Sequence, residues 1–235
     1  MCNEYQVRVN FTDWWKVRGA GRTPIEPRDP PSNRPLNHPI KPTNRAPMLR
    51  PIDPANPAAG LESADRRWWL IPFFHKGPVL AWKSMCTNAR LETVDTAPAF
   101  REAYKHRRAL LPITSFIEYD EPAGWKKGMP KRRWEVTWTP THPFDEVRYF
   151  AGLWDRSTPS DLSEPLESFA FITGPPGPDV AAVHDRQPAV LTFEQGMRWL
   201  QLDGPGKNDL ATATPAGAYT LTERARELDF EPGPK

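Results

Sequence analysis

Cysteine is scarce in this sequence. Only Cys2 and Cys86 occur among 235 residues, and two cysteines cannot build the disulfide framework of a small secreted domain. Neither a CxxC nor an HxxxH spacing is present, so the residues predict no four-ligand zinc site. We therefore expect a protein of a reducing compartment, the cytoplasm, that works without a metal or another cofactor.

Long apolar runs, internal repeats and a strong charge imbalance are also missing. No stretch of about 18 uncharged apolar residues exists, which excludes a membrane-spanning helix. The chain does not open with a charged segment and an apolar run, so we expect no signal peptide. The lack of repeats excludes a solenoid, and a net charge of +2 says little about partners by itself. The length allows one large domain or two small ones.

Proline, by contrast, is abundant, with 29 residues in the chain. It is concentrated in residues 21–60. Because proline removes a backbone donor and fixes φ, we expect neither a helix nor a central strand there. The segment is predicted to be an extended, partly polyproline arm on the surface.

The residues after 65 alternate between short apolar runs and turn residues. Runs rich in aromatic and β-branched residues predict strands, at 68–74, 109–119, 133–139, 148–154, 168–173 and 187–192. A hairpin connection is predicted at 124–130. Helical patterns are fewer, at 97–108, 192–200 and 220–230. Scattered strands with segregated helices predict the α+β class with a mainly antiparallel sheet.

Basic residues gather in three short segments, 22–28, 104–108 and 126–133. Such runs are most often solvated faces. The competing interpretation is a surface that follows the phosphates of a nucleic acid, because Lys and Arg neutralise backbone charge whatever the base sequence.

Cys2 stands directly after Met1, and this position has chemical consequences. Removal of Met1 leaves Cys2 with both a thiol and a free α-amine, whose ordinary pKa values are about 8.5 and about 7.7–8.0. Such a 1,2-aminothiol can attack an acyl group as an N-terminal nucleophile. It can also condense with an aldehyde, the amine forming a Schiff base and the thiol closing a thiazolidine ring. A cysteine without function at a frayed terminus is the third alternative, and Cys2 alone does not choose among them.

Residues 87–93, "TNARLET", carry polar side chains at alternate positions. Asn88, Arg90 and Glu92 share one face of an extended segment. The structural alternatives are a turn or cap role for Asn88 and a surface ion pair between the arginine and the carboxylate, which contributes little to stability.

Two more segments place ionisable groups beside apolar strand patterns. Glu118 ends the strand pattern of "SFIEYD" (115–120), whereas His184, Asp185 and Arg186 precede the apolar residues of "AAVHDRQPAVL" (181–191). An exposed strand-end carboxylate, a structural histidine and an Arg186–Asp185 ion pair are the alternatives here.

Together these segments resemble the SOS-response-associated peptidase (SRAP) family of abasic-site processing proteins. The matching elements run in the family's order over residues 1–200, as "MC", "WWLIP" (68–72), "TNARLET" (87–93), "RALLPITSFIEY" (108–119), "AGLW" (151–154) and "VHDRQPAVL" (183–191). The resemblance implies a single α+β domain over 1–235. It also implies a twisted, barrel-like, mainly antiparallel sheet with a few peripheral helices.

The resemblance further implies a chemistry for Cys2. This residue would react with the ring-opened aldehyde of an abasic site in single-stranded DNA, forming a covalent thiazolidine crosslink that protects the lesion during the DNA damage response. Three residues match the family's catalytic positions: Glu118 the glutamate that moves protons, His184 the histidine that contacts the sugar oxygen, and Asn88 the asparagine that positions Cys2 and the sugar.

DNA contacts follow from the same resemblance. Arg90 and Arg186 are expected to bind phosphates on either side of the lesion. Phe73 and Phe74 match a wedge against the bases, whereas Trp68, Leu70 and Ile71 are expected in the core. The implied protein is a monomer that associates with the nucleoid when it acts on DNA.

The chain also departs from the family's pattern. The family's "MCGR" is replaced by Met1-Cys2-Asn3-Glu4, which would bring a carboxylate near phosphate or near Glu118. The family's "NVAPT" corresponds to Pro39–Thr43, and residues 201–235 form a divergent C-terminal segment. Two other functions stay open. One is an N-terminal-nucleophile cysteine hydrolase or autopeptidase that removes Met1, and the other is a non-covalent single-stranded-DNA binding module.

Overall fold

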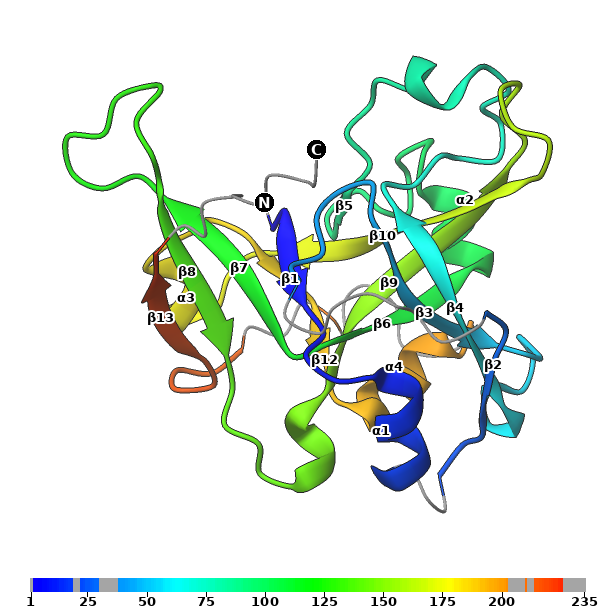
Figure 1. Cartoon of the computed structure of the whole chain (residues 1–235), viewed down its shortest axis with the longest axis horizontal. Helices are drawn as coiled ribbons and strands as arrows, with labels where there is room; N and C mark the ends of the chain where they lie inside the picture. The colour runs from blue at the N-terminus through cyan, green and yellow to red at the C-terminus, as the bar shows by residue number, and fades with distance from the viewer. Residues whose placement is uncertain (1, 19–21, 30–37, 203–209, 211–213, 226–235) are drawn as a thin grey trace, which may run out of the picture.

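The computed structural model describes residues 2–18, 22–29, 38–202, 210 and 214–225, and strands make up most of its regular structure (Figure 1). The strands are β1 (Glu4–Gln6), β2 (Ile25–Pro27), β3 (Arg45–Pro51), β4 (Leu61–Trp68), β5 (Asn88–Arg90), β6 (Arg108–Ile113), β7 (Ser115–Asp120), β8 (Arg132–Thr137), β9 (Arg148–Ser157), β10 (Leu166–Gly174), β11 (Gln187–Pro188), β12 (Val190–Leu191) and β13 (Thr220–Arg224). The α-helices are α1 (Phe11–Arg18), α2 (Arg101–His106), α3 (Pro178–Ala181) and α4 (Phe193–Leu200). Short 3-10 helices lie at Pro57–Ala59, Val79–Ala81 and Pro143–Glu146.

A closed barrel forms the centre of the molecule. Its strands follow the order β4-β3-β6-β9-β10 with antiparallel neighbours, and the circle closes through a parallel pairing of β10 with β4. Four further strands each pair with one barrel strand: β2 with β4, β5 and β11 with β10, and β12 with β9. The predicted α+β class with a barrel-like, mainly antiparallel sheet is therefore confirmed.

A second sheet of four strands, in the order β1-β7-β8-β13, stands beside the barrel. The chain passes from the barrel into it at Thr114, between β6 and β7, so the single strand predicted at 109–119 is wrong. Thr114 makes a corner there: its N–H donates to the Gln6 carbonyl at 2.8 Å, and its hydroxyl accepts from the Arg8 N–H at 3.1 Å. These bonds tie the N-terminal segment to the start of β7.

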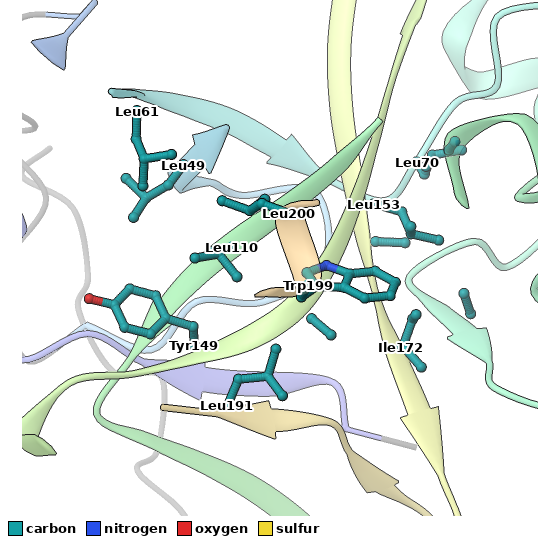
Figure 2. Packing of buried hydrophobic residues seen from close by; sticks show 14 of the residues in the cluster. Leu49, Leu61, Leu70, Leu110, Tyr149, Leu153, Ile172, Leu191, Trp199 and Leu200 are labelled. Carbon is teal, nitrogen blue, oxygen red and sulfur yellow. The ribbon is translucent and has the colours of Figure 1, made fainter. Parts of the chain in front are cut away.

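Alternate side chains of the barrel strands supply two hydrophobic clusters, as the period of two in a strand requires. On β6, Leu110 belongs to one cluster and Leu111 to the other. Figure 2 shows the first cluster, in which Trp199 of α4 lies among barrel leucines. Thr192 begins this helix with a capping box, which confirms the helix predicted at 192–200.

Two predicted elements have the wrong limits or type. The strand predicted at 68–74 ends at Trp68, because Trp69 has a φ of 107° and turns the chain. Trp68, Leu70 and Ile71 are buried as expected. The helix predicted at 220–230 is wrong where it is described, because Thr220–Arg224 pair with β8 as strand β13. The remainder of that prediction, beyond residue 225, lies outside the described residues.

The prediction of no central strand within residues 21–60 is also wrong. Strand β3 lies between β4 and β6 although it contains Pro47 and Pro51. Strand β3 pairs with β6 only at Leu49, opposite Leu110. Few backbone N–H groups of β3 are therefore needed as donors on that side, and the two prolines, which lack an N–H, are tolerated. Residues 30–37 of the predicted arm, and 203–209, 211–213 and 226–235 of the C-terminal segment, lie outside the described residues.

Helix α2 covers only Arg101–His106 of the helix predicted at 97–108. The hairpin predicted at 124–130 is confirmed, since β7 and β8 are antiparallel neighbours joined across it. Among the described helices, none is long and apolar enough to cross a membrane.

Candidate active site

Four segments that are distant in the sequence meet beside the second sheet. Strand β1 pairs with β7, with Glu4 opposite Ile117, which brings residue 2 to the strand that carries Glu118. Strand β10 pairs with β5, which begins at Asn88, and with β11, which follows His184. The sheet register therefore collects all four predicted catalytic residues in one region.

The main chain of Cys2 is held by Asn88. The Asn88 Nδ2 donates to the Cys2 carbonyl oxygen at 3.0 Å and to the Thr87 hydroxyl at 3.1 Å. Thr87 is itself fixed, because the indole N–H of Trp68 donates to its carbonyl at 2.9 Å. A buried core tryptophan thus supports the residue that orients the N-terminal segment.

The Cys2 side chain is buried, and its thiol donates to the Glu4 carbonyl at 3.3 Å. Burial raises the pKa of the Cys2 thiol well above its ordinary value, and the negative charge of a nearby Glu118 adds to this effect. The thiol is therefore held in its neutral form at pH 7 in this structure.

Glu118 is an acid in an apolar environment. Its side chain is 1% exposed, and burial raises its pKa to about 8. Although it lies on a strand and near its end, it is not the exposed carboxylate that the structural alternative predicted. At neutral pH it carries a proton that it can donate.

His184 faces Glu118 across a short gap, with 3.7 Å between its Nε2 and the Glu118 Oε2. The Nδ1 lies 2.9 Å from the Arg186 backbone nitrogen and 3.1 Å from both the Arg186 carbonyl oxygen and an Asp185 carboxylate oxygen, so in a neutral ring it can accept or donate a hydrogen bond there. Burial lowers the pKa of His184 and favours that neutral ring. The backbone N–H of His184 donates to the Val180 carbonyl in α3 at 2.9 Å, so the residue is anchored at the end of this helix.

The two predicted phosphate-binding arginines differ in their surroundings. Arg186 makes two hydrogen bonds to Glu92, at 2.5 and 2.9 Å, and a third to the Thr173 carbonyl. The bond from Arg186 lowers the pKa of Glu92 to about 2. Arg90 is exposed at the end of β5. Arg186 thus pairs with Glu92 and not with Asp185, so the Arg186–Asp185 ion pair of the structural alternative is wrong. Asp185 instead lies 3.1 Å from the His184 Nδ1. A phosphate-binding role for either arginine stays a prediction.

Phe73 and Phe74 are two of the large apolar side chains on the surface, 45% and 43% exposed. Their rings meet edge to face at 5.5 Å, and the Phe73 backbone N–H donates to the buried Asp155 carboxylate at 3.0 Å. The pair is therefore fixed in position while its rings face solvent, which is the arrangement that base stacking requires.

One buried polar cluster next to the site could not be found from the sequence. Glu4 accepts from the Tyr119 hydroxyl at 2.7 Å and forms an ion pair with Arg133, whose side chain is 8% exposed. Its opposite residue is Ile117, so Glu4 lies on the face of β7 that Tyr119 shares and not with Glu118. The Glu4 carboxylate therefore lies on the opposite face from Glu118, so the expectation that the two are neighbours is wrong, whereas its nearness to a phosphate stays a prediction. The cluster forms because β1 and β8 both pair with β7, which lies between them, and no local motif signals it.

No group of three or more His, Cys, Asp or Glu side chains suited to a metal ion occurs among the described residues. The site is instead made of a thiol, an amide, a neutral imidazole and a protonated carboxyl group. Such a set can transfer protons and bind a polar substrate oxygen.

Comparison with known proteins shows the family of this chain. A family model described as SOS response associated peptidase (SRAP) matches residues 1–225. The chain belongs to this family. Among its relatives, the abasic site processing protein YoqW of Bacillus subtilis is 33% identical over 135 residues, which are 57% of this chain and 55% of that protein. The abasic site processing protein YedK of Escherichia coli is 28% identical over 150 residues, or 63% of this chain and 62% of that protein. The aligned part therefore spans little more than half of these relatives.

The SRAP fold is also found in solved structures. A crystal structure of a protein from Bacteroides thetaiotaomicron superposes with a TM-score of 0.73 at 22% identity, and the match covers 96% of this chain and 93% of the other. At this identity the likeness concerns the fold alone.

Proposed function

We propose that this chain processes abasic sites in single-stranded DNA by forming a covalent thiazolidine crosslink at Cys2, which protects the lesion from strand cleavage. The proposal is supported by the family of the chain, by relatives that are named abasic site processing proteins and by the chemistry of the site. The observation that carries it is the buried, protonated Glu118 placed beside Cys2 and His184.

The proposed reaction begins once Met1 is removed and the α-amine of Cys2 is free. The amine nitrogen adds to the aldehyde carbon of the ring-opened sugar, and the resulting carbinolamine loses one water molecule to give an imine. The thiol sulfur then adds to the imine carbon, and its proton passes to the nitrogen. The product has one new C–N bond and one new C–S bond, and the net loss is one water molecule.

Glu118 is proposed as the general acid and base of these steps. As a neutral acid at pH 7 it can protonate the leaving hydroxyl of the carbinolamine, and as a carboxylate it can then accept the thiol proton. A pKa of about 8 suits both directions because it lies near the working pH.

His184 and Asn88 are proposed to bind and orient the reactants. The Nε2 of His184 faces Glu118 and, in the tautomer that carries its proton on this nitrogen, donates to the sugar oxygen when the ring opens. Asn88 fixes the carbonyl of Cys2, so the amine and the thiol are presented in one geometry. Holding both groups against the aldehyde makes the capture effectively unimolecular. The exposed Arg90, Phe73 and Phe74 are proposed to bind the flanking DNA, with the protein acting as a monomer.

The thiol chemistry separates this proposal from a cysteine hydrolase. A hydrolase needs the thiolate as its nucleophile, and burial next to Glu118 disfavours the thiolate of Cys2. Thiazolidine formation begins instead with the amine, and the thiol reacts only after the imine has formed. The neutral thiol therefore favours aldehyde capture over acyl transfer.

The test is denaturing gel electrophoresis of the purified protein with single-stranded DNA that contains one abasic site, after mass spectrometry has verified loss of Met1. A covalent band is expected from the parent and from Cys86→Ala, the matched control at the second thiol. Cys2→Ala should give no stable band. The intact mass of the product should be that of protein plus DNA minus one water. No band from the processed parent would contradict the proposal. If, in addition, the parent and Cys2→Ala bind the strand equally in a native gel, the chain is a non-covalent DNA-binding module.

A further inference from the structure

The structure distinguishes among the three basic segments of the sequence. In 104–108, Arg107 pairs with the buried Asp155, and Arg108 is buried with its guanidinium against backbone carbonyls. In 22–28, Arg22 pairs with Glu194 and Arg28 pairs with Glu62. The arginines of these two segments are therefore largely used within the fold.

The segment 126–133 differs because part of its charge is not compensated. Lys131, Arg132 and Arg133 form ion pairs with Glu121, Asp120 and Glu4. Lys126 and Lys127, at the tip of the β7–β8 hairpin, are exposed and have no ion-pair partner in the part of the chain that the structure describes. Two positive charges therefore face solvent at this tip.

The hairpin tip has a defined shape although it projects from the sheet. Gly124 and Gly128 adopt φ values of +79° and +99°, which side chains other than glycine rarely accept. The Trp125 indole N–H donates to the Met129 carbonyl at 2.8 Å, and the Lys131 ammonium lies 5.1 Å from the indole ring. The Trp125 ring is thus held in place next to two exposed lysines before any ligand binds, which lowers the entropy cost of binding at the ring.

The tip also lies within reach of the candidate active site. Strand β7 carries Glu118 and continues directly into the hairpin, so Trp125 is at most about 23 Å away along an extended chain. The charge of Lys131 is one of the contributions, after burial, that lower the pKa of His184. Figure 1 shows the hairpin projecting on the same side of the molecule as the N-terminus and the loop that follows β4.

We propose that the tip of the β7–β8 hairpin, through Trp125, Lys126 and Lys127, is a second nucleic-acid contact that binds the single strand several nucleotides from the abasic sugar. This inference rests on the proposed function for the identity of the ligand. The lysines bind phosphates and the indole stacks on a base, so the contact has no sequence preference. In Figure 1 the loop that follows β4 lies on the other side of the N-terminus from the hairpin. Phe73 and Phe74 belong to that loop, so the proposed contacts hold the strand on both sides of the lesion.

The first test measures equilibrium binding of an undamaged single strand of about 16 nucleotides, a length chosen from known site sizes, over a series of salt concentrations. The slope of log K against log salt is negative, and each lost phosphate contact makes it less steep by about 0.7. Lys126→Ala/Lys127→Ala should therefore make the slope less steep by about 1.4. The control is Lys16→Ala, an exposed lysine on α1 at the opposite side of the view in Figure 1, which should keep the parent slope. An unchanged slope in the double variant, or an equal decrease in Lys16→Ala, would overturn the proposal.

The second test separates stacking from hairpin structure. Trp125→Leu should weaken binding about 5- to 150-fold by removing the stacked ring, whereas Trp125→Phe should keep most of the affinity because every aromatic ring can stack. Both variants lose the Nε1–H bond to Met129, so equal affinities in the two would refute the stacking role.

The failure of the hairpin proposal can be told apart from failure of the proposed function. Crosslinking is measured with abasic strands of about 4 and about 16 nucleotides. If both proposals hold, the double lysine variant crosslinks the short strand at the parent rate and the long strand more slowly. If the parent crosslinks neither strand, the proposed function fails, while the salt slope on undamaged DNA still decides the role of the hairpin. If the double lysine variant crosslinks the long strand at the parent rate and keeps the parent slope of log K against log salt, the hairpin contact is refuted.

Discussion

Replacing Glu4 by glutamine is expected to destabilise this protein strongly. The Glu4 carboxylate is the counter-charge of Arg133 and also accepts the Tyr119 hydroxyl at 2.7 Å. The side chains of Glu4 and Arg133 are 6% and 8% exposed, so solvent screens their interaction very little. Glu4→Gln keeps the shape of the residue but leaves a buried guanidinium without a negative partner.

The expected loss is about 3–5 kcal/mol of unfolding free energy, the range measured when one partner of a buried pair is removed. That is a large share of the roughly 5–15 kcal/mol that stabilises an ordinary domain. Removing both charges should cost much less, because well-packed apolar replacements of a buried pair are often neutral. The triple variant Glu4→Leu/Arg133→Leu/Tyr119→Phe, which also removes the phenol hydroxyl, is therefore expected to be more stable than Glu4→Gln.

The assay is urea denaturation at pH 7, followed by tryptophan fluorescence and extrapolated linearly to water. A loss below about 1 kcal/mol in Glu4→Gln, the size typical of an exposed ion pair, would refute the reasoning. Glu4 lies in β1, whose pairing with β7 places Cys2 beside the strand that carries Glu118. If Glu4→Gln loosens this pairing, the folded variant should also crosslink abasic DNA more slowly under the proposed function. That rate is to be measured at a temperature where both proteins are fully folded.

Three further predictions concern Glu118, Thr192 and Gly152. The pKa of Glu118 rises from 4.5 to about 8 on folding, so the folded state binds a proton more tightly than the unfolded state. The resulting contribution to the unfolding free energy is fully present below pH 4.5 and is lost as the pH rises through about 8. Glu118→Gln should remove this loss from unfolding free energies measured between pH 4.5 and 9, and a pH profile equal to that of the parent would contradict the prediction. Thr192→Ala removes the capping box of α4 and should cost about 1 kcal/mol in urea denaturation, with Thr192→Ser as the control that keeps the cap. Gly152→Ala places a methyl group 3.0 Å from the Ala109 carbonyl oxygen and 3.1 Å from Leu111, and should cost about 1–3 kcal/mol in the same assay; a stability equal to that of the parent would show that β6 and β9 can move apart.

Local sequence patterns predicted part of the fold well. Apolar alternation and a Thr-initiated helix located β8, β9, β10 and α4 because these elements depend on near neighbours in the chain. The break at Thr114 was not predictable, since the residues on both sides favour a strand. Only the bonds of Thr114 to Gln6 and Arg8 decide where one sheet ends and the next begins.

Long-range pairing overrode local preference at two other places. Thr220–Arg224 have a helix-compatible pattern but become a strand because β8 offers a free edge for pairing. Strand β3 contains two prolines and still lies inside the sheet, because its register with β6 requires only Leu49. The intrinsic secondary-structure preference of a segment decides little when a neighbouring strand supplies backbone hydrogen-bond partners.

The sequence by itself determined which chemical groups are present and in which order: an aminothiol precursor at Cys2, an amide at Asn88, a carboxyl group at Glu118 and an imidazole at His184. Only the tertiary structure decided the state of these groups. Burial keeps Glu118 protonated and the Cys2 thiol neutral, and pairing with Glu92 occupies Arg186. The physical reason is that pKa and available charge depend on desolvation and on partners from distant parts of the chain, which a local pattern does not encode.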